Sequence, residues 1–97
     1  MATTRFRVLD AMPAPHGGYI LQLRLEEGDP PALRALRNAS LEASGPDGEH
    51  ARAEVVGFAV FGGKPSADRF ARTGRVDLHV TGERAATIAA RWDVEIA

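Results

Sequence analysis

Apolar and polar residues alternate along most of this chain with a period of two. Tyr19, Leu21, Leu23 and Leu25 put four apolar side chains on one face of an extended segment, and polar residues fill the other face. Such alternation is typical of a strand with one face on a core and one face in water. Counting this segment, the pattern predicts about six strands, over residues 5–8, 19–25, 39–44, 50–61, 76–81 and 94–96.

Turn residues separate several of these strands. Residues 12–18 contain two Pro and end in Gly17-Gly18, and residues 45–48 read Gly-Pro-Asp-Gly, so each run favours a hairpin-like return. The segment 55–61 differs from the others because it is apolar on both faces, and Gly57 within it predicts a bulge or a sharp bend.

Three segments favour helical turns. Residues 29–38 offer Asp29 as an N-cap, prolines at the first helical positions and two leucines on one side. Residues 66–74 predict a single turn or loop that ends at Gly74. Residues 83–92 place Ala85, Ile88 and Trp92 at helical spacing, so a short helix there would plug one end of a barrel.

Length and composition restrict the architecture. A chain of 97 residues can bury one core, so residues 1–97 are expected to form one domain. It is 44% hydrophobic and 26% charged, and it has no Cys, so packing and hydrogen bonds must supply its stability without disulfides. The predicted fold is all-β: a small six-stranded antiparallel closed β-barrel with one or two short helical turns. No signal peptide or membrane span is indicated, and the cytoplasm is the expected location.

The order of strands and motifs resembles the second domain of translational GTPases such as elongation factor Tu. The matching parts are residues 6–12, Gly17-Gly18, residues 21–28, residues 55–61, residues 74–80 and Thr81-Gly82. The resemblance covers nearly the whole chain and implies a β-barrel without the nucleotide-binding domain. The family's pocket for the aminoacyl end of tRNA would draw on the segment around Asp10 and on an Asn position that Arg75 replaces, so the resemblance implies chiefly a fold.

Catalytic patterns are weak. The nearest approach to a phosphate-binding loop, residues 57–66, has an extra Gly before Lys64 and a Pro after it. His16, His50 and His79 lie in separate segments, so a metal site is not expected. No strained turn surrounds a serine, and the paired carboxylates fall in turns. The chain is therefore expected not to be an enzyme, and no metal or cofactor is indicated.

A basic loop is the best candidate for binding. Lys64, Arg69, Arg72 and Arg75 lie within twelve residues, and Phe70 among them could stack on a base. The alternative is a solvated rim of arginines with Phe70 tucked into the barrel. A second patch, Arg5, Arg7 and Arg24 on the first hairpin, could contact a protein or pair across strands with Glu26 or Glu54.

These features predict a stand-alone, translation-factor-like binding module with an RNA or protein partner near residues 64–75. The net charge of −1 argues against a broad nonspecific nucleic-acid binder. The alternative function is a homo-oligomeric or accessory protein-interaction subunit, with no nucleic-acid role, that packs its double-sided apolar strand 55–61 against another chain.

Overall fold

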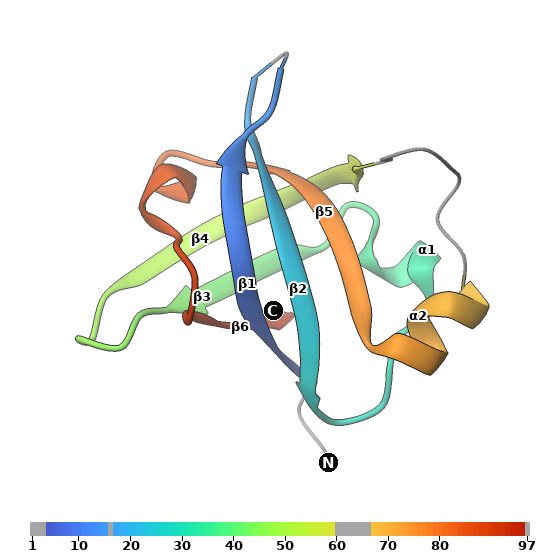
Figure 1. The fold of residues 1–97 in the computed structure, drawn as a ribbon. Helices are drawn as coiled ribbons and strands as arrows, with labels where there is room; N and C mark the ends of the chain where they lie inside the picture. Colours follow the sequence, from blue (N-terminus) through green and yellow to red (C-terminus); the bar gives the residue numbers. More distant parts are fainter. Residues whose placement is uncertain (1–3, 16, 60–66, 97) are drawn as a thin grey trace.

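Six antiparallel strands form a closed barrel in the computed structural model, which describes residues 4–15, 17–59 and 67–96. The barrel order is β1-β2-β5-β4-β3-β6, and β6 pairs with β1 to close it (Figure 1). This confirms the predicted all-β fold. The strands are β1 (Arg5–Pro13), β2 (Tyr19–Glu27), β3 (Ser40–Ser44), β4 (His50–Phe58), β5 (Arg75–Thr81) and β6 (Asp93–Ile96).

The core consists of the alternating apolar residues that predicted the strands. Leu21 and Leu23 of β2 lie opposite Leu78 and Val76 of β5, and the side chains of all four are buried. One face of each strand therefore packs inward, and the removal of this apolar surface from water is the main contribution to stability.

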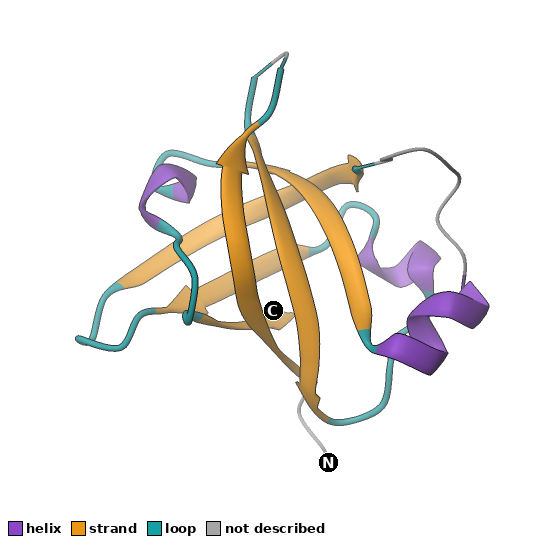
Figure 2. Cartoon of the chain, viewed as in Figure 1, coloured by secondary structure: helices purple, strands orange, loops and turns teal. Residues whose placement is uncertain are grey.

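Helical segments lie at the periphery of the barrel (Figure 2). α1 spans only Leu33–Leu36, shorter than predicted, and Ala32 at its N-cap makes no side-chain cap. The 3-10 helix η1 (Ala85–Thr87) belongs to the predicted plug, since Ala85, Ile88 and Trp92 are all buried. No helix in the described part of the chain is long and apolar enough to cross a membrane.

Residues 66–74 were predicted to be a single turn or loop, and this was wrong. Most of the segment forms the helix α2 (Ala67–Thr73), and Gly74 follows it with a φ of 71°. The N–H of Gly74 donates to the carbonyl of Phe70 at 2.7 Å, and the left-handed conformation of Gly74 ends the helix. Phe70 is the one large apolar residue in this segment, so the sequence had no periodic helix pattern. Burial of Phe70 is enough to stabilise the helix, because tertiary packing stabilises a short helix more than intrinsic propensity does.

Gly57 lies at a β-bulge, as predicted. The register between β4 and β5 shifts at Val55/Gly57, so Val55 pairs with Val80 and Phe58 pairs with Leu78. The bulge lets Val55 and Phe58 both face the core although two residues separate them. Residues 55–61 appeared apolar on both faces in the sequence because the extra residue of the bulge exchanges the inward and outward positions of the strand. Of its described large residues only Val56 is exposed, at 49%.

The first strand has an edge that no other strand covers. β1 pairs with β6 only from Arg5 to Arg7, and the far end of its hairpin extends beyond the barrel (Figure 1). A bulge at Leu9 turns the N–H of Ala11 toward this edge, where the carboxylate of Asp10 accepts its hydrogen bond at 2.9 Å. Pro13 faces the same way, two residues on, and has no N–H. Both donor positions of the edge are thus blocked, which protects it from pairing with another chain.

We predict that the double variant Asp10→Ala/Pro13→Val associates through this edge, because it restores two unpaired N–H groups there. Sedimentation velocity at increasing protein concentration should show a species larger than that of the wild type. The control is Pro46→Val/Asp47→Ala, the same pair of changes in the β3–β4 turn. Identical sedimentation of the wild type and both variants would contradict the assigned role of Asp10 and Pro13.

Candidate functional site

The described part of the predicted basic loop, residues 67–75, consists of α2 and the first residues that lead into β5, which pairs with β2. The N–H of Leu25 in β2 donates to the carbonyl of Gly74 at 2.7 Å, which fixes the start of β5 beside β2. The ring of Phe70 stacks on the ring of Phe6 in β1, with centroids 6.1 Å apart and an interplanar angle of 19°. These contacts fix α2 on the barrel. The position of α2 in turn determines where Arg69 and Arg72 lie.

Phe70 belongs to the core. It is 3% exposed, which supports the reading that placed it inside the barrel and leaves no ring face for a base to stack on. Ligand binding at this site would therefore depend on the exposed arginines and not on the Phe70 ring. Lys64 lies outside the described residues.

Cross-strand register adds a further arginine to the group. Arg24 of β2 is directly opposite Arg75 of β5, and Arg7 of β1 is directly opposite Arg24 on its other side. All three side chains are exposed on the outer face. We call Arg24, Arg69, Arg72 and Arg75 the arginine surface. Sequence reasoning placed Arg24 in a separate patch, because only the pairing of β2 with β5 brings it beside Arg75.

Arg7 differs in its pairing from Arg24 and Arg72 of the arginine surface. Arg7 lies near two carboxylates, with its Nε 3.5 Å from Glu26 and 3.7 Å from Asp93, so the predicted pairing with Glu26 is confirmed. Arg24 and Arg72 make no ion pair or hydrogen bond through their side chains with any residue that the structure describes. The charges of Arg24 and Arg72 therefore have no partner among the residues that the structure describes.

Asp77 of β5 interacts electrostatically with two arginines of the arginine surface. Partial burial raises the pKa of its carboxyl above the ordinary value of 3.8, and the positive charges of Arg69 and Arg75 oppose that rise. Burial is the larger effect, so ionised Asp77 is less stable in the folded protein than in water. The attraction of Arg69 and Arg75 for the Asp77 carboxylate offsets only part of the free-energy cost of burying it.

His50 and His79, the histidines that the structure describes, lie apart, and each contacts a different neighbour. Nε2 of His79 lies 2.8 Å from the carbonyl oxygen of Gly17, which ties β5 to the β1–β2 turn. Nδ1 of His50 is 3.4 Å from Oγ of Ser44, and Asp93 lies on the far side of Ser44 from His50, so no carboxylate orients the imidazole. In the described ranges no three His, Asp or Glu residues are placed to hold a metal ion.

We predict that Asp77→Asn raises the free energy of unfolding at neutral pH and leaves it nearly unchanged in acid. The raised pKa means that the fold favours protonated Asp77, so the wild type loses stability as pH rises past 3.8 and the carboxyl ionises. Urea unfolding at about pH 3 and about pH 7 measures the difference. Asp47→Asn in an exposed turn is the control. A larger gain for Asp77→Asn in acid than at neutrality would contradict the assignment.

No protein-family model, curated protein or solved structure matches this chain. The closed six-stranded barrel implied by the resemblance to translational GTPases is present. Membership of that family has no support from a matching relative, so the function has to be inferred from the geometry of this chain.

Proposed function

We propose that this barrel is a stand-alone binding module that holds the phosphate backbone of RNA on its arginine surface. The observation that carries the proposal is the direct opposition of Arg24 and Arg75 on adjacent strands. Like charges at directly opposite positions destabilise a sheet. A ligand phosphate between the two guanidinium groups would convert that repulsion into paired, charge-assisted hydrogen bonds.

The arginine surface favours backbone contacts over base recognition. Arginine contacts to phosphate position a nucleic acid without reading its sequence, and the buried Phe70 offers no stacking platform. The chain's net charge of −1 means that attraction comes from this local surface and not from the whole molecule. The proposed binding is accordingly moderate and sensitive to salt.

The barrel architecture supports a place in a ribonucleoprotein. The order of strands and motifs resembles that of a translation-factor barrel, and the closed six-stranded fold is consistent with that resemblance. Folds alone do not determine function, so the fold adds to the proposal and the arginine surface carries it.

We predict that Arg24→Ala/Arg75→Ala weakens binding of a single-stranded RNA by at least about tenfold at moderate salt, since each charge-assisted hydrogen bond contributes about 1.5–3 kcal/mol. The slope of log affinity against log salt should also fall by about 0.7, the value for the one single-strand phosphate contact that the two arginines share. Fluorescence anisotropy with a labelled RNA at several salt concentrations measures both quantities.

The matched control is Arg52→Ala/Arg84→Ala, which removes the same charge from exposed arginines outside the arginine surface. It should retain most of the affinity. Equal losses for the two double variants, or wild-type binding that salt does not change, would overturn the RNA proposal.

The competing function is a homo-oligomer built on strand 55–61, and over the described residues 55–59 this strand exposes less apolar surface than the sequence suggested. Val56 is exposed, while Val55 is buried and Phe58 packs against the core. A single exposed valine is normal on a monomer surface. We therefore predict that the wild type sediments as a monomer at high concentration; a dimer that Val56→Asp dissociates would favour the competing function.

A further inference from the structure

Carboxylates border the arginine surface on the side of the β1–β2 turn. The next outward row in that direction consists of Asp10, Gln22 and Asp77, on β1, β2 and β5. It lies two residues along the strands from Arg24 and Arg75, which is about 7 Å. This distance is within the Debye length of about 8 Å at physiological salt, so the two carboxylates repel a phosphate placed beyond the arginines on this side.

The positive row also ends on the side of β1. Arg7 lies opposite Arg24, but its Nε is near the carboxylates of both Glu26 and Asp93, at 3.5 and 3.7 Å. Two negative charges therefore surround one positive charge. A phosphate group that moved from Arg24 toward β1 would meet this net negative charge.

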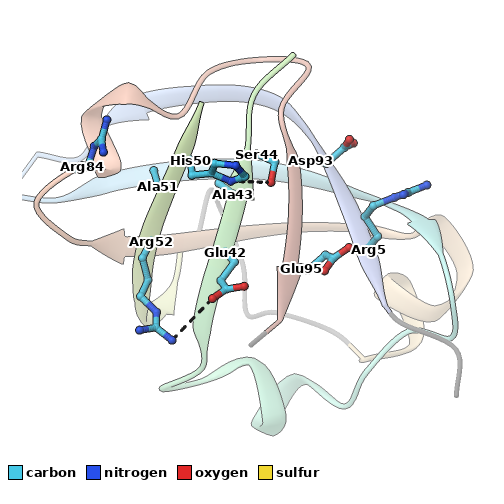
Figure 3. A pocket seen from close by; sticks show the side chains of 10 residues that line it. All are labelled: Arg5, Glu42, Ala43, Ser44, His50, Ala51, Arg52, Arg84, Asp93 and Glu95. Carbon is cyan, nitrogen blue, oxygen red and sulfur yellow. Dashed lines mark hydrogen bonds and ion pairs between the residues drawn. The ribbon is translucent and has the colours of Figure 1, made fainter. Parts of the chain in front are cut away.

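Beyond Arg7 the outer face carries a second charged row, over a cavity of about 580 Å³ (Figure 3). Its members are successive cross-strand partners on β4, β3, β6 and β1: Arg52, Glu42, Glu95 and Arg5. Nη2 of Arg52 lies 3.9 Å from Glu42, and Nη2 of Arg5 lies 3.1 Å from Glu27 on β2. Nε of Arg5 and Oδ1 of Asp93 make no hydrogen bond, but both atoms are buried and cannot contact a ligand. This face therefore does not extend the arginine surface.

Of the borders that the described residues form, the one at α2 is positive. Arg72 in the last turn of α2 is exposed, and its side chain makes no ion pair or hydrogen bond with any described residue. Arg69, one turn earlier, is also exposed. The carbonyl of Gly74 accepts from β2, which holds this end of the helix beside Arg24. Positive charge thus leads away from Arg24 and Arg75 toward α2.

A surface of this shape fits the end of a strand better than its middle. An internal phosphate of RNA has a neighbouring phosphate on each side, whereas a terminal phosphate has a neighbour on one side only. A terminal phosphate monoester also carries a charge of about −1.5 to −2 at neutral pH, compared with about −1 for an internal diester. The monoester therefore offsets the two opposed guanidinium groups of Arg24 and Arg75 more completely.

We infer that Arg24 and Arg75 hold the phosphate monoester at one end of an RNA strand, and that the strand leaves the barrel over Arg72 of α2. The inference rests on the proposed RNA function and specifies which part of the RNA binds. Each guanidinium group can donate two parallel hydrogen bonds to a phosphate, and a monoester offers one more acceptor oxygen without a substituent than a diester does.

The test compares three short single-stranded RNAs of one sequence, with the same internal dye, by fluorescence anisotropy. They carry a 5′-phosphate, a 3′-phosphate or no terminal phosphate, and inorganic phosphate is added as a competitor. One phosphorylated RNA should bind at least about tenfold more tightly than the unphosphorylated RNA, because the latter forms fewer charge-assisted hydrogen bonds. The preferred RNA identifies which end is bound.

The possible failures are distinguishable. Equal affinity for the three RNAs, with salt-sensitive binding that Arg24→Ala/Arg75→Ala removes, would overturn the end inference and leave the RNA proposal standing. Displacement of the phosphorylated RNA by an equal concentration of inorganic phosphate would overturn it by identifying free phosphate as the ligand. Absence of binding by all three RNAs would overturn the RNA proposal and the end inference together.

The carboxylate borders are tested by Glu26→Gln/Asp77→Asn. This variant removes one negative charge from each border, so it should raise the affinity for unphosphorylated RNA and reduce the preference for the phosphorylated end at least severalfold. Asp47→Asn/Glu49→Gln, the matched changes in the β3–β4 turn, should leave the preference as it is in the wild type. An equal preference in the wild type and both variants would overturn the inference.

The exit of the strand over α2 is tested by Arg72→Ala. This variant should weaken binding of the phosphorylated RNA severalfold, because it removes the cation next to the bound end. Arg84→Ala, which removes an exposed arginine before η1, is the control and should bind like the wild type. Equal affinities of the two variants would contradict the exit over α2.

Discussion

The inward packing of alternating apolar side chains is the constraint on which the rest of this structure depends. Because side chains alternate between the two faces of a strand, a slip of one residue in register would turn a whole apolar set outward. Leu21 opposite Leu78 and Leu23 opposite Val76 therefore determine how β2 lies against β5. The same register determines which charged side chains meet on the outer face, so the core also positions the arginine surface.

Strands were predictable from the sequence because their signal is local. The alternation of Tyr19 to Leu25 needs no knowledge of neighbouring strands, and the bulge at Gly57 could also be predicted from one segment. The predictions failed where a tertiary contact decides the outcome. α2 exists because Phe70 packs on Phe6, a contact between residues far apart in the chain, and a stretch with one large apolar residue gave no local sign of it.

The candidate sites were predictable only in part for the same reason. Arg69, Arg72 and Arg75 are close in sequence, so their clustering was visible, but Arg24 joins them only through the β2–β5 register. The charged row of Arg52, Glu42, Glu95 and Arg5 had no sequence signal at all. It uses one residue from each of four strands, and among the described residues Glu95 lacks an ion pair because Arg5 pairs with Glu27.

The outer face of this barrel places like charges opposite each other on adjacent strands, although opposite charges there would be more stable. This arrangement has a cost in folding free energy. Arg7 lies near the carboxylates of Glu26 and Asp93, which shows that the sheet can neutralise an arginine where acidic residues are its neighbours. Arg24 opposite Arg75 and Glu42 opposite Glu95 show the contrary pattern. A buried polar atom without a partner costs about 1–3 kcal/mol, a large part of the stability of a small domain. The barrel also blocks its exposed β1 edge with Asp10 and Pro13, so unfavourable features are not tolerated everywhere on its surface. Violations of local rules that survive in an otherwise consistent fold are expected at functional sites, and the opposition of Arg24 and Arg75 lies on the surface proposed to bind RNA.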